Sequence, residues 1–98
     1  MTEVYTYSYI KDLLSRVNDN NKLKWSDFLL ILKYLNIKLD NIDKLKKKKI
    51  LVITNKAIVY EILNRLYTIV NLKQVENDMA LKQMTDILKE IRLRLDGL

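Results

Sequence analysis

The apolar stretch at residues 25–39, WSDFLLILKYLNIKL, is the feature that most constrains the fold of this chain. At about 100° per residue on a helix, its apolar side chains fill one broad face and a narrower stripe on the opposite side. The broad face holds Trp25, Phe28, Leu29, Ile31, Leu32, Leu35 and Leu39, and the stripe holds Leu30, Tyr34 and Ile37. A helix that is apolar on two sides needs neighbours on both, so this segment is expected at the centre of a helical bundle.

Three further segments show helical spacing of their apolar residues. The expected helices cover residues 4–17, 26–42, 55–72 and 78–95. In the last of these, apolar residues recur at intervals of three and four, at Leu81, Met84, Leu88, Ile91 and Leu95. Short connectors reverse the chain between neighbouring helices. The sequence therefore predicts an all-α fold, an antiparallel four-helix bundle, with a single domain over residues 1–98.

Polar residues predict where the helices begin and end. Ser26 or Asp27 is expected to cap the second helix by accepting a backbone hydrogen bond. Residues 18–21, NDNN, predict a turn, because these side chains compete for backbone hydrogen bonds. Asn77 or Asp78 is expected to cap the fourth helix. Gly97 is expected to end that helix, since glycine accepts the left-handed conformation found at many helix ends.

Residues 50–53, ILVI, are the one stretch with strand character, being continuous and rich in β-branched side chains. No second strand-like run in the chain can pair with it and satisfy its backbone groups. We therefore expect it to cover the end of the bundle or to join the third helix early. Thr54 or Asn55 is then a suitable cap for the third helix.

A run of lysines precedes this stretch, at Lys46, Lys47, Lys48 and Lys49. Consecutive like charges repel one another, so the run is interpreted as a solvated basic loop, with a phosphate-binding patch as the alternative. A nucleic-acid-binding surface more typically interleaves arginine and aromatic residues. The net charge of +6, from 18 basic and 12 acidic residues, is compatible with nucleic acid, anionic lipid or an acidic protein patch as partner.

Several residue types that are common in catalysis are missing. The chain has no His and no Cys, and its only Gly is at position 97, so neither a thiolate nucleophile nor a glycine-rich phosphate loop is available. We expect a binding protein without cofactor or metal. Neither a secretory signal nor an apolar run of membrane-spanning length is recognisable, which favours the cytoplasm.

Three short motifs are similar to those of a known family. Residues 25–29, WSDFL, and residues 38–40, KLD, resemble the start and end of the second helix in enterocin A-type (class IIa) bacteriocin immunity proteins. Residues 63–66, LNRL, resemble part of that family's third helix. From the residues alone, Asn64 and Arg65 are interpreted as surface or loop-bracing residues.

The resemblance implies a function in immunity to a bacteriocin. Such a protein is a small, basic, cytoplasmic four-helix bundle that protects the producing cell without catalysis. It acts at the inner face of the membrane on a receptor, a mannose-type sugar transporter, that the bacteriocin has engaged. Peripheral contact with the membrane surface would accompany that role.

In that family the C-terminal half is associated with specificity, so the outward residues of the fourth helix and its end are the candidate partner contacts. They are Lys82, Lys89, Arg92, Leu93, Arg94 and Leu98. Leu93 lies opposite the apolar stripe and is predicted to be exposed. Two other classes remain open: a small basic module that binds nucleic acid or regulates a partner, and a structural oligomerisation domain.

Overall fold

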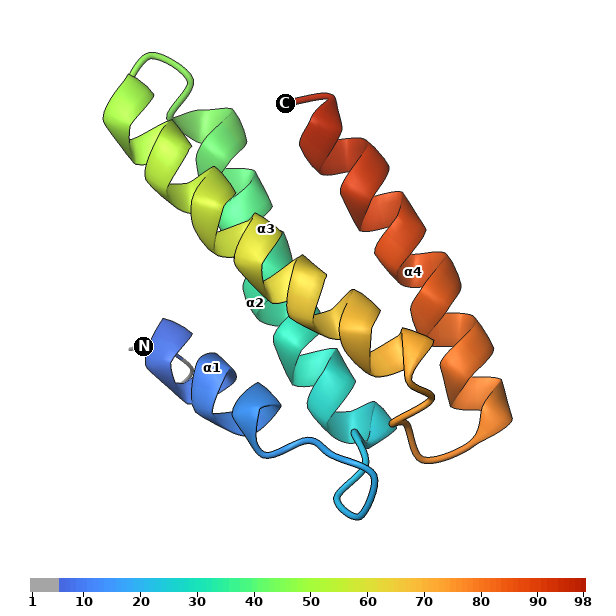
Figure 1. The fold of residues 1–98 in the computed structure, drawn as a ribbon. Helices are drawn as coiled ribbons and strands as arrows, with labels where there is room; N and C mark the ends of the chain where they lie inside the picture. The colour runs from blue at the N-terminus through green and yellow to red at the C-terminus, as the bar shows by residue number, and fades with distance from the viewer. Residues whose placement is uncertain (1–5) are drawn as a thin grey trace.

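Residues 6–98, which the computed structural model describes, form four helices and no extended strand (Figure 1). They are α1 (Tyr7–Ser15), α2 (Trp25–Lys44), α3 (Lys49–Asn71) and α4 (Asp78–Asp96). Successive helices run in opposite directions, and α3 contacts each of the other three. The bundle measures 43 × 28 × 20 Å. The predicted antiparallel four-helix bundle is confirmed.

One apolar core runs along the bundle and draws on all four helices. Its fully buried members include Ile10, Phe28, Ile31, Leu35, Leu39, Ile62, Leu63, Leu66, Met84 and Leu88. Trp25 is partly buried and stacks on Phe28, with 5.6 Å between the ring centroids. The periodic stripe of the fourth helix is confirmed as core, with Leu81 at its edge.

The prediction of burial on two sides of α2 was wrong in part. Leu29, expected on the broad buried face, is 44% exposed, and Ile37 of the opposite stripe is also exposed. Tyr34 of the same stripe is buried. The neighbouring helices therefore cover a wide arc of α2 but leave the flank at Leu29 in solvent.

α3 begins six residues earlier than predicted, at Lys49 instead of residue 55. Residues 50–53 form its first turns, so the alternative that they join the third helix early is correct. Thr54 and Asn55 do not cap the helix. Their side chains instead donate to the backbone carbonyls of Ile50 (2.9 Å) and Leu51 (2.7 Å), one turn earlier.

The cap of α2 comes from a distant part of the chain. Ser26 and Asp27 lie inside the helix, so the predicted cap was wrong. The backbone N–H of Trp25 donates instead to Oε1 of Glu76, at 2.6 Å. Next to it, an isolated parallel bridge joins Leu23 to Val75. The α1–α2 and α3–α4 connectors are thereby tied together at one end of the bundle.

The remaining boundaries follow local signals with small shifts. α1 is capped by Thr6, whose side chain accepts from the backbone N–H of Tyr9; the expected start at residues 4 and 5 lies outside the described residues. α2 runs to Lys44, two residues past the expected end. Asn77 caps α4 as predicted, accepting from Ala80 at 2.8 Å. Gly97 has a right-handed φ of −80°, so the expected left-handed ending was wrong.

Candidate functional site

The outward side of α4 carries three of the six predicted contact residues. Lys82, Lys89 and Leu93 are exposed and share one side of the helix by their spacing of seven and four residues. Leu93 is 74% exposed, as predicted. Neither lysine forms an ion pair with any residue of the described chain. These side chains can therefore meet a partner without first breaking an internal contact.

The two arginines of this set are engaged inside the molecule. Arg92 lies over the ring of Tyr60 at 5.2 Å and donates through Nε to Oδ1 of Asp96 at 3.2 Å. Arg94 donates through Nη2 to Oδ1 of Asp40 on α2, at 2.8 Å. The side chains of both ion pairs are about half exposed to solvent, which limits what each pair contributes to stability. The arginines brace the end of α4 against α3 and α2.

Leu98 is also turned inward. It is partly buried and packs against the core, and its backbone N–H bonds the carbonyl of Leu95 at 3.1 Å. Of the predicted contacts, the structure therefore brings Lys82, Lys89 and Leu93 together and places the other three in internal contacts.

Two acidic residues of the same side, Asp86 and Glu90, were left out of the predicted contact surface. Asp86 and Glu90 lie between and beside the two lysines, and Met79 at the start of α4 is 73% exposed. The signal that could have found them is their helical spacing from Lys82 and Lys89. The surface is thus of mixed charge with an apolar residue at each end.

The hydroxyl of Tyr60 links α3 to the end of α4. It donates to Oδ1 of Asp96 at 3.0 Å. This hydrogen bond to a carboxylate raises the pKa of Tyr60, because loss of the phenolic proton would remove the bond and place two negative charges together.

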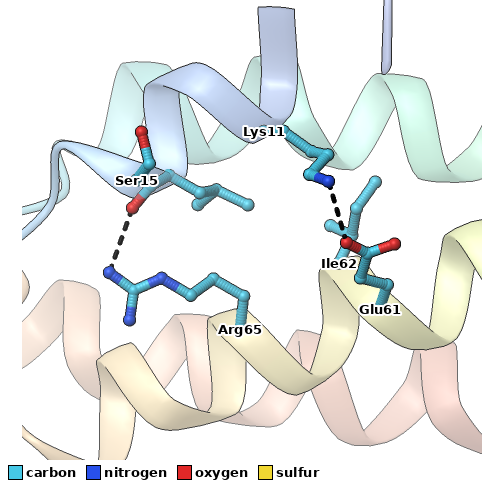
Figure 2. Close-up of a pocket in the computed structure, with 6 residues that line it drawn as sticks. Lys11, Ser15, Glu61, Ile62 and Arg65 are labelled. Carbon is cyan, nitrogen blue, oxygen red and sulfur yellow. Dashed lines mark hydrogen bonds and ion pairs between the residues drawn. The ribbon is translucent and has the colours of Figure 1, made fainter. Parts of the chain in front are cut away.

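A second cluster of polar residues lies in a small hollow between α1 and α3 (Figure 2). Lys11 on α1 points at Glu61 on α3, with 3.3 Å between Nζ and Oε1. The hydroxyl of Tyr7 also donates to Glu61. The hydrogen bond from Tyr7, followed by that from Lys11, lowers the pKa of Glu61; in turn the bonds to Glu61 raise the pKa values of Tyr7 and Lys11.

Arg65 closes the other end of this hollow (Figure 2). Its Nη2 donates to the carbonyl oxygens of Leu14 (3.0 Å) and Val17 (3.1 Å), near the C-terminal end of α1. The carbonyl of Leu14 also accepts from the backbone N–H of Val17 at 3.2 Å, so Arg65 adds a second donor there and supplies one to Val17, just past the end of α1. The interpretation of Arg65 as a loop-bracing residue is confirmed, and Asn64 beside it is exposed.

The lysine run lies at the opposite end of the bundle from the tied connectors, as the α2–α3 turn. Three of its lysines are exposed, in agreement with the predicted solvated loop: Lys46, Lys47 and Lys48. The fourth, Lys49, is the first residue of α3. Lys46 pairs with Asp43 at 3.1 Å, and both side chains are mostly in solvent.

No described cluster has the form of a metal site. Within residues 6–98, no group of three metal-ligating side chains lies together. Over the same residues, no helix has both the length and the apolar character required to cross a bilayer.

Comparisons with known proteins add no relative. No protein-family model, curated protein or solved structure matches the chain.

Proposed function

We propose that this chain is a bacteriocin immunity protein. It would protect the cell that makes a class IIa bacteriocin by binding, from the cytoplasm, the membrane sugar transporter that the peptide has engaged. The proposal rests on the resemblance at residues 25–29, 38–40 and 63–66, taken together with the basic, four-helix character of the chain.

The observation that carries the proposal is the position of the resembling residues. Residues 25–29 form the start of α2, residues 38–40 lie near its end, and residues 63–66 lie in α3. In the family they resemble, the same motifs stand at the start and end of the second helix and in the third. The agreement in element and order supports a common arrangement of helices.

These motif residues have structural roles in the bundle. Phe28, Leu63 and Leu66 are buried, and Arg65 braces α1. Buried residues cannot touch a partner, so recognition is assigned to a different surface. The exposed side of α4, with Lys82, Lys89 and Leu93, is the surface we propose for contact with the transporter and its bound peptide.

Binding at this surface requires no chemistry from the chain. Lysines can pair with acidic groups of a partner, and an exposed leucine gains by leaving water at an interface. We propose accordingly that the protein acts without catalysis or a cofactor, by occupying its receptor.

The test is protection of a sensitive strain. Expressed inside a bacterium sensitive to class IIa bacteriocins, the chain should protect against one cognate peptide of that class and not against unrelated pore-forming peptides. The Lys89→Ala/Leu93→Ala variant should lose most of that protection, while its free energy of unfolding changes by only about 0.5 kcal/mol because both side chains are exposed.

A matched control is Lys33→Ala/Leu72→Ala, which removes one exposed lysine from α2 and one exposed leucine from the residue that follows α3. It should protect as well as the unaltered chain. Soluble expression without protection against a panel of class IIa peptides would contradict the immunity function. Full protection by the Lys89→Ala/Leu93→Ala variant would contradict only the assigned surface.

A further inference from the structure

The net charge of this protein is concentrated in one segment. Residues 44–60 contain six of the 18 basic residues and none of the 12 acidic ones, so the remaining 12 basic residues balance the acidic residues elsewhere. The six are lysines at positions 44, 46, 47, 48, 49 and 56. The excess of +6 therefore arises over the end of α2, the α2–α3 turn and the first turns of α3, where Lys46 alone of the six pairs with an acidic residue of the described chain, Asp43 just before the segment.

Large apolar side chains protrude at the same place. Ile50 is 80% exposed, Ile53 is 67% exposed, and Leu51 is 43% exposed. Ile50 and Ile53 are three residues apart and so share the outward side of α3. Exposed isoleucines add nothing to the core, and apolar residues gathered on a surface commonly mark a contact site.

The position of these residues suits contact with a broad surface. The α2–α3 turn stands at one end of the molecule, away from α1 (Figure 1). Lys47, Lys48 and Lys49 line a shallow hollow there together with Ile50 and Leu51. The first turn of α3 has no acidic residue and no side-chain cap, so the positive end of its helix dipole adds to the lysine charge.

We propose that this α2–α3 tip, comprising residues 44–53, binds the surface of an anionic phospholipid bilayer. The lysine ammonium groups would lie at the level of the lipid phosphates and carboxylates, while Ile50 and Ile53 enter the acyl boundary beneath them. Lysine suits this arrangement because its flexible apolar stem can lie along the acyl region with its charge in the headgroups.

The exposed apolar residues favour a lipid surface over a nucleic acid. A nucleic acid supplies phosphates for the lysines, but its backbone has no apolar phase for Ile50 and Ile53. The tip also holds no arginine and no aromatic residue, which stacking on bases would use. An anionic bilayer complements both the charge and the apolar side chains.

The resemblance implies contact with the membrane surface but names no site or lipid; this inference supplies both, and it does not depend on the proposed function. Lipid binding at the tip needs neither a bacteriocin nor a transporter, and the tip shares no residue with the α4 surface. Vesicle binding and protection of cells are therefore separate measurements that can fail separately.

The experiment is cosedimentation of the full chain with vesicles. Vesicles of phosphatidylserine and phosphatidylcholine should retain the protein at low salt, whereas vesicles of phosphatidylcholine alone should not. Retention should weaken as salt is raised, because salt screens the lysines. The K47Q/K48Q/K49Q variant should bind at least about tenfold more weakly, since each lysine near such a surface contributes about fivefold.

A second variant tests the contribution of Ile50 and Ile53 to vesicle binding. I50S/I53S should also reduce vesicle binding by about tenfold or more, at unchanged net charge. Two controls match the variants: K22Q/K24Q/K33Q removes the same charge elsewhere, and M79S alters an equally exposed apolar residue on α4. Both controls should bind within about twofold of the unaltered chain. Thermal unfolding should be nearly the same for all four variants, because every altered side chain is exposed.

Several results would overturn the proposal. Failure of the unaltered chain to bind phosphatidylserine vesicles at low salt is one. Equal weakening by K22Q/K24Q/K33Q would mean that the charge acts diffusely and not through the tip. Unchanged binding by I50S/I53S, or tighter binding of the tip to double-stranded DNA than to vesicles, would exclude insertion into lipid.

Discussion

The position of a residue around the helix decides whether it lies in the core or on the surface of α4. Met84, Leu88 and Leu95 are fully buried, whereas Leu93, two positions before Leu95, is 74% exposed. Two residues rotate a helix by about 200°, so chemically identical leucines face opposite environments. The same substitution should therefore have very different effects at neighbouring positions.

We expect Leu88→Ala to lower the free energy of unfolding by about 2–5 kcal/mol, because it removes buried contacts and leaves a cavity. Leu93→Ala is the matched control and should change the free energy of unfolding by about 0.5 kcal/mol or less. Denaturant midpoints measure both. A loss below about 0.5 kcal/mol for Leu88→Ala would show that this position is not part of a packed core.

Arg65 holds α1 through its guanidinium group. Arg65→Met keeps most of the apolar stem but loses both hydrogen bonds to the carbonyls of Leu14 and Val17. We expect the free energy of unfolding to fall by about 1–3 kcal/mol, because two hydrogen bonds from a charged donor are lost at a partly buried site. Amide hydrogen exchange should rise in α1 before it rises in α2.

Arg16→Met is the control for that experiment. Arg16 pairs with Asp12 one turn away, in solvent, so its replacement should leave amide hydrogen exchange in α1 close to that of the unaltered chain and have little effect on stability. Equal exchange rates for Arg65→Met and the unaltered chain would contradict the bracing role.

At the scale of whole elements, α1 depends most on its neighbours. It has nine residues, and isolated helices shorter than about 12 residues are marginal in water. Its buried side chains Ile10, Leu13 and Leu14 attach it to the core. Glu61 and Arg65 on α3 add polar contacts at two points along it. The position of α1 in the bundle therefore depends on side chains of both α1 and α3.

The packing of α1 on α3 should weaken at acid pH. Glu61 has a lowered pKa in the folded protein, so the stabilisation from its hydrogen bonds is present at neutral pH and is lost as pH falls through that lowered pKa, below the ordinary 4.5. The raised pKa values of Tyr7 and Lys11 act in the opposite direction, because their stabilisation is lost as pH rises through them, above 10.0 and 10.5.

Urea unfolding as a function of pH tests this. Glu61→Gln should unfold at lower urea than the unaltered chain at neutral pH, and the difference should shrink below pH 4.5 as Glu61 is protonated. Glu90→Gln, on the exposed side of α4, should show no such pH-dependent difference. A difference that stays constant down to low pH would argue against a charged Glu61 in the contact.

On the scale of the whole molecule, the two ends of the bundle are built differently. At one end, the Leu23–Val75 bridge and the hydrogen bond from Trp25 to Glu76 hold two connectors together. At the other, the α2–α3 turn is open, basic and partly apolar. The closed end holds two connectors together, whereas the open end leaves its lysines and isoleucines in solvent.

The sequence by itself determined the number of helices, their order and most of the core. Apolar periodicity depends only on the geometry of one helix, so residues such as Leu88 could be assigned to the core before any packing was known. Turns and the Asn77 cap were also predictable, because their hydrogen bonds reach only a few residues along the chain. For the candidate α4 surface, the same periodicity predicted the exposure of Leu93.

Only the tertiary structure decided the contacts between distant segments. The cap of α2 by Glu76 and the bracing of α1 by Arg65 join residues about fifty positions apart, which no local pattern encodes. The same holds for Arg92 and Arg94, whose contacts with Tyr60 and Asp40 distinguish them from Lys82 and Lys89. Helical periodicity can place a side chain on an outward face, but whether it is free to meet a partner depends on which other helix lies beside it.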